Sequence, residues 1–143
     1  MAANTKPVYP KTPVATVGQT LTTANTAKDG TGTVVTLLTA GADGAKFDGV
    51  NVAYTGTSVA TTLKLFLNNG GATSTATNNA LIKSINVPAN TLTSEINTTA
   101  DFFTKALDGG SLMVPPNYKI TACIGVTVAN AIYVLPTAGD LTA

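Results

Sequence analysis

The chain has 143 residues, enough for one domain, with 10% charged residues, 44% hydrophobic residues and a formal net charge of +1. It contains no histidine, so it has no imidazole base for a serine or cysteine nucleophile and no histidine ligand for zinc. These absences exclude Ser-His triads and histidine-bound zinc hydrolases. They favour a protein that is not an enzyme and that holds neither a cofactor nor a metal.

The basic residues are eight lysines, spread almost evenly along the chain, and there is no arginine. Binding to a phosphate backbone needs a concentrated basic patch, so we do not expect nucleic acid as a partner. No apolar run approaches the ~18 residues of a membrane helix, and the first residues lack the apolar stretch of a signal peptide. We therefore expect a soluble protein made in the cytoplasm, without a membrane partner. The single cysteine, Cys123, is expected to be a small buried hydrophobe.

Residues 1–15 are predicted to form an extended N-terminal arm. Pro7, Pro10 and Pro13 recur at three-residue spacing, which is typical of a polyproline-like segment rather than of a packed element. Such a terminus is most often simply frayed; alternatively, it lies on a neighbouring subunit or partner and becomes ordered there. Tyr9 favours the second interpretation, because the arm has no local core to receive its ring. The capsid or subunit interface residues predicted on this basis are Lys6, Pro7, Tyr9, Pro10, Lys11 and Pro13.

From about Thr16 onward, short runs rich in Val, Ile, Leu, Thr and Phe alternate with Gly, Asn, Asp and Pro clusters, which is the pattern of strands and turns. In chain order, we predict strands at 19–23, where the pattern is weak, and at 33–39, 47–54, 58–67, 80–87, 99–107, 117–128 and 131–135. Segment 99–107 could also form a turn of amphipathic helix, but its length and threonine content favour a strand.

The clearest strand is 117–128, in which all six even-numbered positions are apolar and the odd-numbered positions are more polar. This alternation predicts one buried face and one more polar face. Pro115 and Pro116 are expected to fix how the chain begins this strand. Tight turns are predicted where glycine follows Asp or Asn, including Asp48-Gly49, and segment 68–79 is predicted to be a long, exposed and mobile loop.

A helix-poor chain with about eight strands can bury its apolar faces in two packed antiparallel sheets or in a closed barrel. The strands are short and unequal, and the loops vary in length. These features suit crossing connections better than a regular up-and-down barrel. We therefore predict an all-β, antiparallel β-sandwich domain over residues 16–143, preceded by the arm.

Most of the seven carboxylates sit beside glycine in predicted turns, where we expect them to accept hydrogen bonds from their own turn backbone. Asp43 and Asp48 could be oxygen ligands for Ca²⁺, but their spacing lacks the regular ligand pattern of a calcium loop. A glycosidase-type pair of acids is a further alternative, although nothing in the sequence places two of them across a cleft. Tyrosines are the best anchors for an interface, but Tyr118 and Tyr133 lie on alternating strands, which favours packing roles.

The scarcity of charge favours a protein that works by association. With so few charged residues, apolar and hydroxyl-bearing patches must reach the surface, and large patches of that kind mark association sites. The centres of obligate interfaces are also depleted in charge. We therefore expect a subunit of an oligomer.

Four segments together resemble a known group of proteins: 37–50 (LLTAGADGAKFDGV), 62–67 (TLKLFL), 81–87 (LIKSINV) and 112–120 (LMVPPNYKI). Each is weak alone, and the order of all four is the more specific feature. In that order they resemble the small jelly-roll proteins of tailed-bacteriophage virions, in particular capsid decoration, or cement, proteins. The resemblance implies an eight-stranded sandwich of jelly-roll type, often trimeric, that sits outside an icosahedral shell and ties neighbouring capsomers together. The chain departs from the pattern by lacking arginines in the strands and by carrying a longer tail, 136–143.

The preferred hypothesis is a structural virion protein on the capsid surface, a homotrimer whose arm, together with its sheet edges or loops, contacts the major capsid protein. Many weak contacts would then add through multivalency. The alternative is a carbohydrate- or receptor-binding jelly-roll module of a virion fibre or head fibre. That alternative requires an exposed aromatic platform, which four tyrosines and no tryptophan supply poorly. An enzyme ranks last, for want of a credible acid–base pair.

Overall fold

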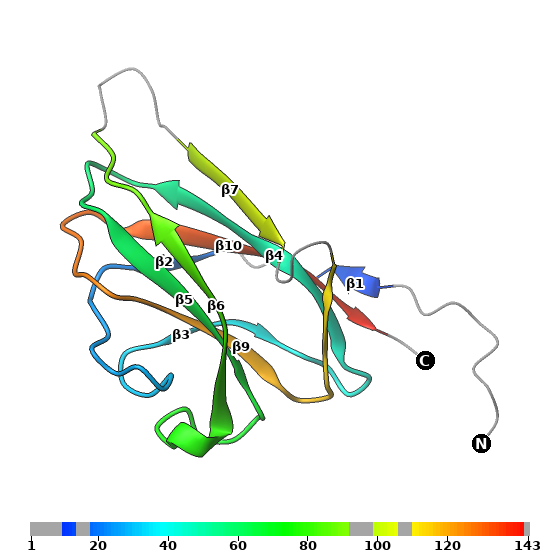
Figure 1. Cartoon of the computed structure of the whole chain (residues 1–143). Helices are drawn as coiled ribbons and strands as arrows, with labels where there is room; N and C mark the ends of the chain where they lie inside the picture. Colours follow the sequence, from blue (N-terminus) through cyan, green and yellow to red (C-terminus); the bar gives the residue numbers. More distant parts are fainter. Residues whose placement is uncertain (1–9, 14–17, 92–98, 106–109, 142–143) are drawn as a thin grey trace, which may run out of the picture.

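The computed structural model describes residues 10–13, 18–91, 99–105 and 110–141, and most of them lie in strands (Figure 1). In chain order, the strands are β1 (Pro10–Pro13), β2 (Gln19–Leu21), β3 (Val35–Thr39), β4 (Ala45–Tyr54), β5 (Thr61–Asn68), β6 (Asn79–Val87), β7 (Thr99–Lys105), β8 (Leu112–Val114), β9 (Lys119–Ile124) and β10 (Ile132–Leu141). A 3-10 turn, η1 (Ala76–Asn78), precedes β6. All eight predicted strands are present, although several of their ends differ.

The strands form two antiparallel sheets packed face to face. Sheet A has the order β2-β10-β4-β7, with the short strand β1 also paired to β10 and the short strand β8 also paired to β4. Sheet B has the order β3-β9-β5-β6. Without β1 and β8, this is the strand order of an eight-stranded jelly roll. The predicted antiparallel β-sandwich of jelly-roll type is therefore confirmed.

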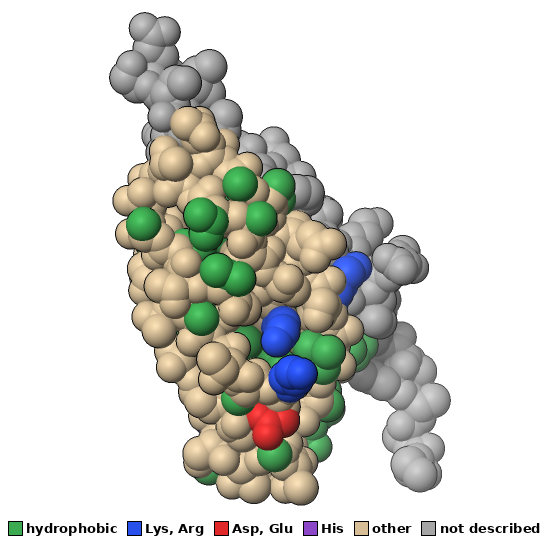
Figure 2. Space-filling view, turned by 60° about the vertical axis from the view of Figure 1, so that its left-hand side comes forward, with side chains coloured by type: hydrophobic (Ala, Val, Ile, Leu, Met, Phe, Trp, Pro, Cys, Tyr) green, Lys and Arg blue, Asp and Glu red, His purple; other side chains and the backbone are tan. Residues whose placement is uncertain are grey.

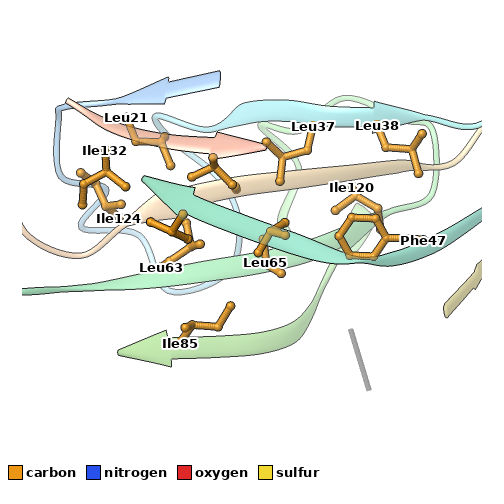
Figure 3. Packing of buried hydrophobic residues seen from close by; sticks show 14 of the residues in the cluster. Leu21, Leu37, Leu38, Phe47, Leu63, Leu65, Ile85, Ile120, Ile124 and Ile132 are labelled. Atoms are coloured by element: carbon orange, nitrogen blue, oxygen red, sulfur yellow. The ribbon is translucent and has the colours of Figure 1, made fainter. Parts of the chain in front are cut away.

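The inner faces of the two sheets share one hydrophobic core (Figure 3). Its fully buried members include Phe47, Val50 and Val52 of β4, Leu63 and Leu65 of β5, and Leu37, Leu38, Ile120, Ile124 and Ile132 of the flanking strands. Burying one such side chain stabilises the fold by about 1.5–3 kcal/mol relative to leaving it exposed. Apolar packing between the sheets, rather than ion pairing, therefore holds this charge-poor chain together.

The predicted turn at Asp48-Gly49 is wrong, because both residues lie inside β4. Opposite them the register of β10 shifts: Thr137 pairs with Gly49, but the next residue, Ala138, pairs with Phe47. Asp48 is thus the extra residue of a β-bulge. The bulge resets the alternation of β4, so that Phe47 and Val50 both face the core although they are three residues apart.

The predicted strand 117–128 is also shorter than expected, and its more polar face is buried as well. Its regular part is β9, in which Thr121 and Cys123 are as fully buried as the apolar residues that alternate with them. Val126, expected in the core, lies beyond the end of the strand and is 47% exposed. Alternation in the sequence thus predicts which residues share a face of the strand, but it does not predict whether another segment buries that face.

Residues 22–34, here called the β2–β3 segment, pack against this second face of sheet B. The Asn25 N–H donates to the Ile124 carbonyl at 2.8 Å, and the Asn25 side chain donates to the carbonyls of Thr31 (2.6 Å) and Thr33 (3.0 Å). Burial raises the pKa of the Cys123 thiol, with partial offsets from Lys64 and from a hydrogen bond with Asn25. The expectation that Cys123 is a buried hydrophobe is confirmed.

Residues 136–141 are not a tail, because they continue β10 and pair with β4 as far as Asp140 opposite Ala45. This extension was not predicted because proline cannot donate a hydrogen bond to a ladder, so that Pro136 indicates the end of a strand. Among the described residues, the other edge of β10 is paired only at 132–134, with β2, and at 139–141, with β1. Pro136 falls between these two stretches, where its missing N–H removes no ladder bond on that edge.

The proline pair before β9 has the role predicted for it. The Tyr118 N–H donates to the Pro115 carbonyl at 3.1 Å, and Asn117 has a φ of 62°. Proline at the second position of a turn and a left-handed residue at the third define a type II turn. The Pro115–Tyr118 turn therefore aims the chain into β9.

We expect Gly30→Ala to destabilise the fold by about 1–3 kcal/mol, because the new methyl group would have no space and an unfavourable backbone conformation. Gly30 has a φ of +80°, and a Cβ there would lie 2.9 Å from the Phe66 ring and 2.8 Å from Asn79 Cβ. Chemical denaturation measures the effect. Gly110→Ala is the matched control, since no atom lies within 4 Å of its added Cβ. Equal stability of the two variants would contradict a tight contact between the β2–β3 segment and sheet B.

Candidate interaction surface

The predicted interface residues fall into two groups. Lys6, Pro7 and Tyr9 lie outside the described residues, whereas Pro10, Lys11 and Pro13 belong to β1. β1 pairs antiparallel with the end of β10 in the same chain, with Pro10 opposite Leu141 and Pro13 opposite Gly139. The described part of the arm is thus an edge strand of its own domain, and its role in an interface stays a prediction.

A shallow apolar depression of about 470 Å³ lies at one end of sheet B. Its walls come from the start of β5, the end of β6 and the loop after β9: Ala60, Thr61, Thr62, Asn86, Val87, Pro88 and Val126. None of these residues is charged. Val126 on the rim is 47% exposed, and Val59, which precedes the lining residue Ala60, is 54% exposed.

Hydrogen bonds from three elements fix the walls of the depression. The Tyr54 hydroxyl donates to the Pro88 carbonyl at 2.6 Å, and Ser58 and Asn90 exchange two backbone hydrogen bonds of 2.8 Å. The Val126 N–H donates to Thr61 Oγ1 at 3.0 Å. The depression is therefore preformed, and little ordering entropy would be lost when a partner covers it.

In Figure 2 the lysine and acidic side chains lie toward one end of the face drawn, where hydrophobic side chains adjoin them, and further hydrophobic side chains are scattered over the other end. The walls of the depression themselves carry no charged residue. An uncharged centre with exposed aliphatic side chains has the composition of a protein interface core. This surface was not predicted because the alternation of 117–128 assigns Val126 to the core. Gly125, which directly follows the last residue of β9, was the available signal.

Asp29 and Asp48 each have hydrogen-bonding or ionic partners close by. Hydrogen bonds from the Thr31 hydroxyl (2.6 Å) and the Thr31 N–H (3.1 Å) lower the pKa of Asp29, as expected for an acid in a turn. Asp48 pairs with Lys46 at 3.0 Å and accepts a hydrogen bond from the Ser111 hydroxyl. Within the described part of the chain, no group of three or more His, Cys, Asp or Glu side chains could hold a metal ion.

The described tyrosines are packed rather than displayed. Tyr54 is 6% exposed, and Tyr118 and Tyr133 are half-buried. Gly18 lies against the Tyr133 ring, where an added Cβ would come within 2.5 Å of Cε1. These three residues therefore do not form the exposed aromatic platform that a carbohydrate-binding module requires, and Tyr9 lies outside the described residues.

The chain matches no known family, no curated protein and no solved structure in the comparisons made. In the part of the chain that the structure describes, no helix is long and apolar enough to cross a membrane. The interpretation of the surface therefore depends on its own physical features.

We expect the stability of the protein to fall above about pH 10 through Tyr54. Burial raises the pKa of its phenol, so the folded state favours the protonated form. The resulting stabilisation is complete below the unfolded-state pKa of about 10 and is lost as the pH rises toward the higher folded-state pKa. In Tyr54→Phe this loss should be absent, and stability at neutral pH should decrease by about 1 kcal/mol because the bond to Pro88 is missing. Denaturation curves across the alkaline range test this, and parallel pH profiles for the two proteins would contradict it.

Proposed function

We propose that this protein is a structural virion protein: a capsid decoration, or cement, protein that binds the outside of a tailed-bacteriophage head as a homotrimer and bridges neighbouring capsomers. The jelly-roll strand order supports the proposal, because it is the architecture implied by the resemblance of four sequence segments. One fold can host many functions, so the surface of the domain must support this particular function.

The observation that carries the proposal is that β1 and the end of β4, which the depression adjoins, lie at opposite ends of the sandwich (Figure 1). β1 pairs with the end of β10, near Ala45 at the start of β4, whereas the depression adjoins Tyr54 at the end of β4. β4 has ten residues, and at ~3.3 Å per residue it separates the two regions by about 30 Å. A body with separate contact regions of this kind can touch two neighbours at once, as bridging requires.

The described architecture also suits a mechanical role. Two sheets share one core, and the β2–β3 segment covers part of the second face of sheet B, so the body between the two regions is stiff. Each contact can be weak, because many copies on one shell add their contributions. Since the depression is uncharged, attachment through it should depend little on ionic strength.

A charge placed at the rim of the depression should weaken attachment to the shell. We expect Val126→Lys to reduce affinity for capsids that lack the protein by about tenfold or more, because a lysine must be desolvated in an apolar interface. Leu81→Lys is the matched control, since Leu81 is 54% exposed on β6, outside the depression. Co-sedimentation with capsids of the encoding phage measures binding. Unchanged binding of Val126→Lys, or an equal loss in the control, would argue against the depression as the contact.

Removal of residues 1–9 deletes the predicted interface residues Lys6, Pro7 and Tyr9 but keeps β1. The variant therefore distinguishes an effect on binding from an effect on the sheet. We expect this variant to unfold at the same denaturant concentration as the full chain but to bind capsids about tenfold or more weakly. Light scattering on both proteins reports the oligomeric state. Full attachment of the truncated protein would remove residues 1–9 from the mechanism, and a full-length protein that is monomeric at every concentration would overturn the trimer.

A further inference from the structure

The loop between β5 and β6 contains the most chemically labile dipeptide of the chain. Asn69-Gly70 is the only Asn-Gly pair in the sequence. In such a pair the glycine amide can attack the asparagine side chain with little steric hindrance. We propose that Asn69 is a latent deamidation site, held unreactive in the folded protein by the hydrogen bonds of its own loop and released when the loop opens. This inference is independent of the proposed capsid role.

The reaction needs only water. The Gly70 nitrogen loses its proton and bonds to Asn69 Cγ, the Cγ–Nδ2 bond breaks, and Nδ2 leaves as ammonia with that proton. Water then adds to either carbonyl of the resulting succinimide and breaks one ring C–N bond. The product is an aspartate or an isoaspartate at position 69.

Each group that must react is engaged in a hydrogen bond. The Gly70 N–H, the nucleophile, donates to Asn68 Oδ1 at 2.9 Å. On the electrophile, Asn69 Oδ1 accepts from the Gly71 N–H at 3.0 Å, and Asn69 Nδ2 donates to Asn78 Oδ1 at 3.2 Å. Attack on Cγ requires rotation of the Asn69 side chain and release of the Gly70 amide, so the loop opposes it at both reacting atoms.

The rest of the loop resists the opening that would free these groups. Asn68 is fully buried and its side chain donates to Asn79 Oδ1 at 2.8 Å, while Asn79 Nδ2 donates to the Thr73 carbonyl at 2.9 Å. The Asn69 N–H donates to the Asn78 carbonyl at 3.0 Å, which continues the β5–β6 pairing into the loop. The composition of 68–79 predicts a mobile tip, but this network holds its backbone in place. Deamidation should therefore follow the population of the opened loop.

The product would not restore the closed loop. A carboxylate at position 69 cannot donate to Asn78 Oδ1, so two oxygens would face each other across the loop. Isoaspartate would also insert a methylene group into the main chain between positions 69 and 70, next to the last β5–β6 pair, Asn68 opposite Asn79. The modification thus converts a self-closed loop into an open, negatively charged one.

The experiment compares deamidation of the full-length protein under native conditions and in urea, in the same mildly alkaline buffer. Intact mass and peptide mapping follow the conversion at position 69. We expect deamidation in the native protein to be at least about tenfold slower than in the denatured chain, because several hydrogen bonds must break together before Asn69 can react. Equal rates would overturn the proposal, and this comparison does not depend on any variant folding.

Asn78→Ala tests the network directly, because it removes the acceptor of Asn69 Nδ2 while leaving the Asn69-Gly70 pair intact. We expect several-fold faster conversion at position 69 in this variant, with the fold monitored by circular dichroism. Asn130→Ala is the matched control: its side chain bonds the Thr57 carbonyl at 2.8 Å in another loop, and its rate at position 69 should equal that of the unmodified sequence. A folded Asn78→Ala protein with the control rate would also overturn the proposal.

Discussion

The pairing of β10 with β4 is the constraint on which the other features depend. It runs from Ile132 opposite Tyr54 to Asp140 opposite Ala45 and joins the last strand of the domain to its centre. β10 in turn carries β1 and β2 on its other edge. Because this pairing spans the length of the sandwich, it sets the distance between the β1 region and the apolar depression. A contact of such long sequence separation forms only when most of the chain is in place.

The outer face of sheet B is a second apolar surface, and the β2–β3 segment covers part of it. Phe66 and Cys123 point away from the core shared by the sheets, yet both are buried. The β2–β3 segment reaches this face through the backbone of Asn25 and through the close approach of Gly30 to the Phe66 ring. Hydrogen bonds of the Asn25 amide shape the segment that does the covering. The apolar outer face of sheet B is thus covered by a neutral segment whose shape depends on the Asn25 amide and on Gly30.

The exposed ends of sheet B are also held by hydrogen bonds between neutral groups. The depression at the end of sheet B is uncharged, and its walls are fixed by hydrogen bonds of Tyr54, Ser58 and Thr61. At the opposite end of sheet B, asparagine side chains close the β5–β6 loop on itself. Rigid, neutral ends favour a protein that acts by contact, and the proposed capsid role uses this property directly.

The sequence by itself determined eight of the ten strands of the described residues and the class of fold, because alternation at period two follows from the pleat and needs no knowledge of partners. It did not predict the short strands β1 and β8. It did predict the burial of Cys123 from its residue type, and the role of Pro115 and Pro116 in directing the chain into the next strand from proline geometry. Only the tertiary structure decided that Asp48 is a bulge, that Pro136 continues a strand and that Thr121 is buried. Each of these depends on what lies opposite or above the residue: the register of β10, a gap between β1 and β2, and the β2–β3 segment. The depression belongs to the same group, since its walls come from three segments that meet only in the folded chain.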